Sequence, residues 1–152
     1  MTPNSVFVIH AFSTFYLVGL IWMVQIVHYP LMDRVNSDRF AAFETDHSRI
    51  ITPVVAPMML LELATGALLA LGYAPTWMPL WAAWTGLFAI LLIWASTFFI
   101  QVPCHAILAS GFDEAVHQRL VTTNWIRTIL WTARGVMVGV ILWRALENTG
   151  AL

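Results

Sequence analysis

Two histidines, His28 and His105, stand at the ends of long apolar stretches, and each follows a glutamine, Gln25 or Gln101, by about one helical turn. A histidine and an amide are costly to bury in apolar surroundings unless they have partners. Because the pattern occurs twice, we expect a two-sided site that binds a transition metal or haem. In this site the glutamines would orient the histidines or a bound oxygen species. The alternative is that both histidines lie among lipid headgroups.

A third histidine extends this site. His47 ends an amphipathic segment that places Phe40, Phe43 and His47 on one helical face. We therefore predict that His28, His47 and His105 form a facial set of metal ligands, which suits iron, copper or zinc rather than magnesium or calcium. The alternative for His47 is a solvated position in a loop.

Two Glu-x-x-His strings, Glu44 to His47 and Glu114 to His117, match the pair that di-iron carboxylate bundles take from two helices. Such sites also need a glutamate from each of two further helices, and here only Glu62 lies within an apolar stretch. The ligand count therefore argues against a four-carboxylate di-iron site.

The composition indicates the solvent of this chain. Hydrophobic residues make up 60% and charged residues 10%, which is far from the balance of soluble globular proteins. Four apolar stretches, at about residues 5–32, 50–73, 77–103 and 121–146, each reach the roughly 20 helical residues that cross a bilayer. Helices satisfy their own backbone groups in lipid. We predict an all-α membrane protein whose residues 1–152 form a single four-transmembrane-helix bundle. The first stretch lacks a basic segment before it, so we expect it to remain in the mature protein.

The connections predict the orientation. Residues 33–49 and 104–120 are polar loops with amphipathic segments, whereas the link at residues 72–79 is short and uncharged. Most arginines lie in or just beyond the polar loops: Arg34, Arg39, Arg49, Arg119 and Arg127. The positive-inside rule therefore places both loops and both histidine ends in the cytoplasm, with the N and C termini outside, and we expect a bacterial inner membrane. The chain has no lysine, which excludes Schiff-base chemistry through a lysine amine.

The two halves of the chain also resemble each other, and each is made of a helix, a polar loop and a helix. The segment from Gln25 through His28 to Pro30 is similar to the segment from Gln101 through Pro103 to His105. Both halves have the same order and orientation, which predicts parallel repeats related by an axis along the membrane normal. This arrangement would bring the two histidines to the same depth.

Two charges lie within the apolar stretches. Glu62 and Arg134 stand at comparable distances from the cytoplasmic end, and an unpaired charge there costs at least about 2.5 to 3.5 kcal/mol. We therefore expect them to pair, as a structural ion pair or as a proton relay. Arg127 would line the foot of the fourth helix, where its guanidinium suits a carboxylate, a propionate or a quinone oxygen. The alternative for Arg127 is a headgroup anchor. We predict catalytic roles for Glu62, Arg127 and Arg134, and cofactor contacts for Gln25, Gln101 and Asn124.

Four helices, polar first and third connections, and His28 and His105 at matching helix ends carry a family resemblance. In these features the chain resembles small bacterial membrane proteins of the anthrone-oxygenase-like and HemJ-type families. The resemblance implies a bundle that holds haem or handles an aromatic, redox-active small molecule.

These patterns predict a metal- or haem-dependent membrane oxidoreductase whose lipophilic substrate, such as a quinone or another aromatic, arrives from the bilayer. One alternative is a transporter with a water-accessible path through Glu62. Another is an accessory subunit that packs through Gly135 and Gly139, whose small-xxx-small spacing also fits internal packing or a homodimer seam. We expect no nucleic-acid partner.

Overall fold

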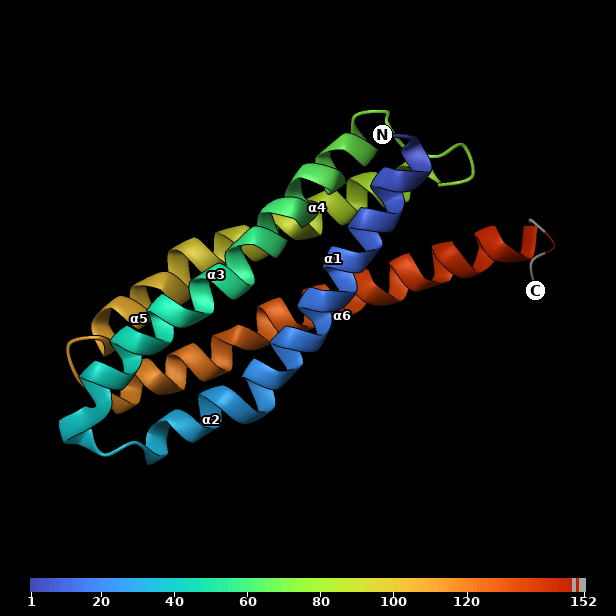
Figure 1. The fold of residues 1–152 in the computed structure, drawn as a ribbon. Helices are drawn as coiled ribbons and strands as arrows, with labels where there is room; N and C mark the ends of the chain where they lie inside the picture. The colour runs from blue at the N-terminus through green and yellow to red at the C-terminus, as the bar shows by residue number, and fades with distance from the viewer. Residues whose placement is uncertain (149, 151–152) are drawn as a thin grey trace.

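The computed structural model describes residues 1–148 and 150 as a bundle of four helical rods. The first rod runs through α1 (Pro3–Met23), the π-helical turn η1 (Val24–His28), α2 (Tyr29–Leu31) and the short 3-10 turn η2 (Met32–Arg34). The second is α3 (Ser37–Ala70). The third runs through α4 (Leu80–Ser96), the π-helical turn η3 (Thr97–Gln101) and α5 (Val102–Leu108), and the fourth is α6 (Glu114–Asn148). The start of α1 and the end of α6 lie at one end of the bundle, opposite the turns that join α2 to α3 and α5 to α6 (Figure 1).

All four rods are long and apolar enough to cross a membrane, by length and composition. Large apolar side chains cover the outside of the bundle, and Phe88, Phe99 and Val136 are 63%, 78% and 63% exposed. A soluble monomer rarely exposes so much contiguous apolar surface, whereas lipid solvates it. The predicted all-α, four-helix membrane fold is therefore confirmed.

The predicted polar loops are mostly helical. α3 begins at Ser37 and α6 at Glu114, so the loops shrink to residues 35–36 and 109–113. The amphipathic segments within the predicted loops form the first turns of α3 and α6. One face of each segment packs on the bundle, since Phe40 and Glu44 of α3 and Leu120 of α6 are all 0% exposed. At 1.5 Å per residue the 34 residues of α3 extend about 51 Å, well beyond a hydrocarbon core of about 30 Å.

Local signals mark the helix ends. Asp113 caps α6, because its Oδ1 accepts a hydrogen bond of 3.0 Å from the backbone N–H of Val116. At the end of α3, Gly72 adopts φ +104°, and the N–H of Tyr73 donates to the carbonyl of Leu68. This is a Schellman end, and the left-handed conformation it needs favours glycine.

Prolines explain the two π-helical turns. Pro30 and Pro103 each lie two residues beyond a π-helical turn, and helix continues past both. A proline within a helix lacks an N–H and crowds the carbonyl four residues earlier, and a widened turn relieves both problems. The proline and the preceding turn match between the two halves, whereas Gln25 lies five residues before its proline and Gln101 only two. The structure thus corrects the predicted register of the repeat by about one helical turn.

Packing within the chain uses the small residues of α6. A Cβ atom at Gly135 would lie 3.0 Å from Cγ2 of Val18, and one at Gly139 would lie 3.9 Å from Cζ of Phe15. Both glycines therefore face α1. Of the three uses that the small-xxx-small spacing allows, which are packing in a larger complex, a homodimer seam and internal packing, the structure shows internal packing.

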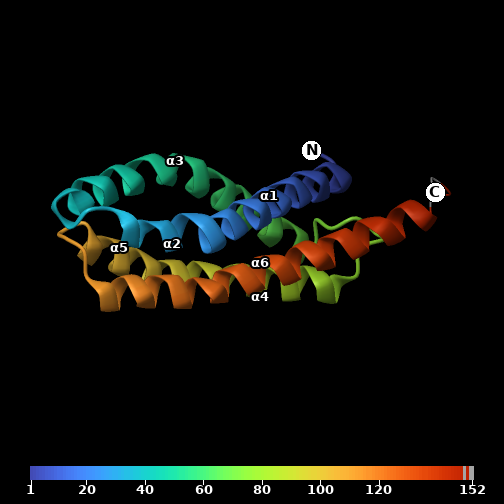
Figure 2. The ribbon, with the colours of Figure 1, turned by 90° about the horizontal axis from the view of Figure 1, so that it is seen from below.

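α3 is bowed over its first half, as Figure 2 shows. Pro53 and Pro57 lie inside this helix. Each removes one backbone hydrogen bond and bends the helix, and together they account for the bow.

Candidate functional site

The end of the bundle opposite the chain termini brings together the three histidines predicted as ligands. His28 Nε2 and His47 Nδ1 lie 2.9 Å apart, with ring centroids 4.4 Å apart. The ring centroids of His47 and His105 are separated by 5.5 Å. His28 comes from η1, His47 from α3 and His105 from α5. The prediction that these side chains meet is confirmed, and we call this group the histidine cluster.

His105 is held between a carboxylate and a phenol. Its Nδ1 lies 2.6 Å from Oε1 of Glu44, and its Nε2 lies 3.0 Å from the hydroxyl of Tyr29. An ionised carboxylate only accepts hydrogen bonds, so Nδ1 carries the proton and Nε2 accepts from the tyrosine O–H. We call this chain of hydrogen bonds the Glu44–His105–Tyr29 relay. Glu44 is 0% exposed and Tyr29 3%, so the relay is shielded from solvent.

Two further contacts position the relay. Ser48 donates to Oε1 of Glu44 over 3.2 Å, while the buried Oε2 of Glu44 has no hydrogen-bond partner among the residues that the structure describes. His117 Nε2 donates to the backbone carbonyl of Tyr29 over 2.8 Å. Tyr29 is thus tied to α6 at its backbone and to α5 through its hydroxyl.

The three-histidine ligand set stays a prediction in this arrangement. Among residues 1–148 and 150, no group of three or more His, Cys, Asp or Glu side chains could hold a metal ion. The physical reason lies in the hydrogen bonds, since both nitrogens of His105 are engaged by Glu44 and Tyr29, and His28 and His47 bind each other. The transition metal or haem stays a prediction.

The glutamines do not orient the histidines as expected. Gln25 donates to the carbonyl of Val121 over 3.1 Å, and its Oε1 accepts from Nδ2 of Asn124 over 2.9 Å. Gln101 accepts from Ser96 over 3.0 Å and donates to α6. Both glutamines, together with Asn124, therefore join the rods beside the cluster. Sequence spacing could not reveal this, because it gives the face of a helix on which a side chain lies but not which groups of the neighbouring helix that side chain meets.

A pocket of about 270 Å³ lies beside the histidine cluster, between the bowed part of α3 and α4, η3 and α5. All four rods contribute to its walls. The polar lining consists of Tyr29, His47, Thr52, Thr97, Gln101, His105 and Arg127, and the apolar lining includes Val55, Met59, Trp94, Phe98 and Val102. Pro53 and Pro57 lie within the stretch of α3 that forms one wall, so the bend of α3 leaves room for the pocket. An apolar cavity with a few converging polar groups is typical of a ligand site.

Arg127 enters this pocket from α6. It is 8% exposed, which does not support the headgroup-anchor alternative. Its Nη1 lies 3.4 Å from the hydroxyl of Thr97, and its guanidinium lies 5.5 Å from the ring centroid of Trp131. Nε is buried without a hydrogen-bond partner, and no acidic side chain in the described part of the chain forms a salt bridge with it.

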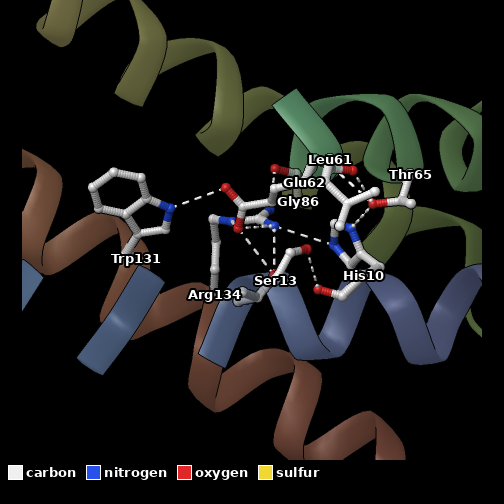
Figure 3. A network of polar contacts seen from close by, with 9 residues as sticks. His10, Ser13, Leu61, Glu62, Thr65, Gly86, Trp131 and Arg134 are labelled. Carbon is white, nitrogen blue, oxygen red and sulfur yellow. Dashed lines mark hydrogen bonds and ion pairs between the residues drawn. The ribbon is translucent and has the colours of Figure 1, made fainter. Parts of the chain in front are cut away.

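A second polar site lies deeper in the bundle and contains the predicted ion pair of Glu62 and Arg134 (Figure 3). Nη2 and Nε of Arg134 lie 2.9 and 3.3 Å from Oε1 of Glu62, and Trp131 donates to Oε2 over 3.0 Å. Thr14 donates to Oε1 as well. The two charged residues are 1% and 2% exposed, so the prediction that they pair is confirmed.

Further hydrogen bonds complete this network. Arg134 donates to the carbonyl of Gly86 and to Nε2 of His10, which lies 3.1 Å away. His10 Nδ1 therefore carries a proton and donates to Thr65 over 2.9 Å, and the hydroxyl of Thr65 donates to the carbonyl of Leu61. The network accounts for both charges without a ligand, which favours the structural interpretation of the pair over the relay.

Sequence reasoning missed several partners. Glu44 carried a signal, since it belongs to a Glu-x-x-His string, but that string indicated a di-iron site that the other helices could not complete. His117 belongs to the second Glu-x-x-His string, which likewise did not indicate its bond to the backbone of Tyr29, and Tyr29 carried no comparable signal. Nothing local pairs His10 with Arg134, which lies in a different rod.

Fold and site define an all-α protein with four helices apolar enough to span a membrane and with two buried polar sites. No family model matches the chain, and neither a curated protein nor a solved structure matches it. The family resemblance stays a prediction.

Proposed function

We propose that this protein is a membrane enzyme that binds a lipophilic aromatic molecule of the quinone or phenol class and exchanges a proton with an oxygen of that molecule. The observation that carries the proposal is that the Glu44–His105–Tyr29 relay ends at the wall of the pocket. Both Tyr29 and His105 line the cavity, and Glu44 lies behind His105.

The relay can accept a proton and keep the new positive charge of His105 beside a carboxylate. The hydroxyl oxygen of Tyr29 accepts the O–H of a phenolic ligand, while Tyr29 passes its own proton to Nε2 of His105. The imidazolium that forms keeps its Nδ1 hydrogen bond to the carboxylate of Glu44, which stabilises the new positive charge in these buried surroundings. The products are the ligand oxyanion and a His105–Glu44 ion pair. The reverse transfer returns the proton to the ligand oxygen.

Access from the bilayer fits the position of the pocket. Phe98 and Val102 line the cavity and are 56% and 50% exposed, so the pocket reaches the apolar outer surface of the bundle. A ligand dissolved in lipid can enter between α3 and the third rod. The apolar lining then holds the ring, and the polar groups orient its oxygen.

A chromophoric phenol tests this proposal. A lipophilic 4-nitrophenol is added to the protein in lipid nanodiscs, at a pH where the free probe is neutral, because its absorption separates phenol from phenolate. We expect wild-type protein to bind phenolate. Glu44→Gln removes a charge-assisted hydrogen bond worth about 1.5 to 3 kcal/mol, so the bound phenolate to phenol ratio should fall about tenfold or more. Tyr29→Phe should lower it as well.

Asp46→Asn is the matched control. Asp46 lies two residues beyond Glu44 on the same helix, but its side chain is 63% exposed and pairs with Arg49. The same change from carboxylate to amide should therefore leave the spectrum of the bound probe unaltered. A wild-type protein that binds only the neutral phenol would refute the proton relay.

The predicted oxidoreductase activity requires an electron carrier, whereas the proton transfer from the ligand to His105 does not. Elemental analysis and an absorption spectrum of the purified protein test it, together with the His28→Ala/His105→Ala variant. Stoichiometric iron or copper, or a Soret band, lost in that variant would support an oxidoreductase, whereas zinc, which has no redox chemistry, would support a metal site without electron transfer. Metal-free protein that still ionises the probe would restrict the function to proton transfer.

We also propose that the histidine cluster faces the cytoplasm of a bacterial cell. This proposal is supported by the concentration of arginines near the end of the bundle that holds the histidine cluster. Labelling of Ser110→Cys and Thr76→Cys variants with a membrane-impermeant thiol reagent on intact cells tests this orientation. The cytoplasmic assignment is wrong if Ser110→Cys is the one that reacts.

A further inference from the structure

Arg127 is a buried cation whose charge the described part of the chain does not compensate. The other buried arginine, Arg134, contrasts with it, because Glu62 neutralises Arg134 at 2.9 Å. Within residues 1–148 and 150, Arg127 contacts Thr97 at 3.4 Å and the ring of Trp131, and its buried Nε has no hydrogen-bond partner. A charge removed from water without a counter-ion is strongly unfavourable, and buried charges are normally paired.

The unsatisfied donor belongs to a group that lines the pocket. Arg127 contributes to the wall of the 270 Å³ cavity beside Thr97 and Gln101. Trp131 lies against the guanidinium, which restricts its orientation and leaves donors at its edge available. The N–H groups of a guanidinium form a planar fork that binds two oxygens of one carboxylate. Arg127 thus provides the missing half of a charge-assisted pair.

We propose that the ligand of this pocket carries a carboxylate that binds Arg127, so that the ligand class is a lipophilic aromatic acid. This inference rests on the proposed function, since both place the ligand in the same cavity. A single guanidinium, with the buried carboxylate of Glu44 behind the lining residue His105, suits a monoanion better than a doubly charged phosphate. The cavity lies just below the usual range of about 300–1,000 Å³, which limits the ligand to a small ring system. Met59, Trp94 and Phe98 supply the apolar walls that such a ring needs.

Two probes of nearly equal shape test the carboxylate. Binding of 2-naphthoate and of 2-naphthamide to the protein in nanodiscs is measured by equilibrium dialysis, with empty nanodiscs as the partition blank. We expect the wild-type protein to bind the carboxylate about tenfold or more tightly than the amide. Arg127→Gln should abolish this preference and leave the affinity for the amide unchanged. Arg119→Gln is the matched control, because Arg119 lies two turns earlier on α6 and is exposed.

The outcomes separate this inference from the proposed function. Equal binding of both probes to wild-type protein overturns the carboxylate inference and leaves ligand binding intact. Binding of neither probe overturns both. If the Arg127→Gln variant retains the preference for 2-naphthoate, or if the Arg119→Gln variant also loses it, Arg127 is not the residue that binds the carboxylate. If Arg127→Gln does not fold, the binding preference of the wild-type protein and its thermal stabilisation by each probe still test the inference. We expect 2-naphthoate to stabilise the wild-type protein more than 2-naphthamide does. Equal stabilisation by the two probes would contradict the inference.

Discussion

The ion pair of Glu62 and Arg134 permits a quantitative test of how this bundle tolerates buried charge. Both side chains are almost fully buried, and the carboxylate accepts two hydrogen bonds from the guanidinium. Glu62→Gln leaves the guanidinium without its counter-ion, and Arg134→Met leaves the carboxylate without its own. Each single change should therefore cost about 3 to 5 kcal/mol of stability.

The double variant Glu62→Gln/Arg134→Met should lose far less stability than the sum of the losses of the two single variants. If the two effects were independent, the loss would be about 6 to 10 kcal/mol. In the double variant no charge remains buried at this site. The amide oxygen of the new glutamine can still accept from Trp131, and its NH2 group can donate to the hydroxyl of Thr14 in place of Arg134. What is lost is the pair of hydrogen bonds from Arg134 to Gly86 and His10, at about 1 to 3 kcal/mol each. We expect an interaction energy of about 3 kcal/mol between the two positions.

Unfolding by SDS in mixed micelles, followed by tryptophan fluorescence, measures these differences. Asp46→Asn serves as the surface control, because its exposed pair with Arg49 should contribute no more than about 1 kcal/mol. Additive losses, within about 0.5 kcal/mol, would show that the two buried charges do not depend on each other and would refute the reasoning.

Two further predictions concern the backbone. Pro53→Ala/Pro57→Ala should straighten α3 and narrow the pocket. Because the apolar walls supply most of the contact, 2-naphthoate binding should weaken about tenfold or more. An unchanged affinity in equilibrium dialysis would show that the prolines do not form the cavity. Gly66→Ala should destabilise the bundle by about 1 to 3 kcal/mol, because its Cβ would lie 2.6 Å from Cδ1 of Ile90. Gly19→Ala, where a Cβ meets nothing within 4 Å, should instead stabilise the protein slightly, and equal SDS unfolding of the two variants would contradict the close packing at Gly66.

Much of the candidate site followed from residue type and spacing. His28, His47 and His105 were expected at one end of the bundle, and they meet there. Their partners were not predicted, since a helical pattern gives the face of a residue but not the rotation and height of the facing helix. Glu44 reaches His105 across 61 positions of sequence, and neither residue identifies the other. The glutamines show the same limit, because they turn to α6 instead of the histidines.

The amino-acid sequence by itself determined that four apolar helices form, because composition and run length decide whether a segment is stable in lipid. It also determined that Glu62 and Arg134 pair, because an isolated charge in an apolar stretch has few favourable alternatives. Only the tertiary structure decided that α3 and α6 include most of the polar loops and that the bow at Pro53 and Pro57 leaves a pocket. It also decided that Arg127 lines this pocket without a counter-ion from the described part of the chain. These features depend on how one rod is turned and bent against another, and that information is distributed over contacts between residues far apart in the chain.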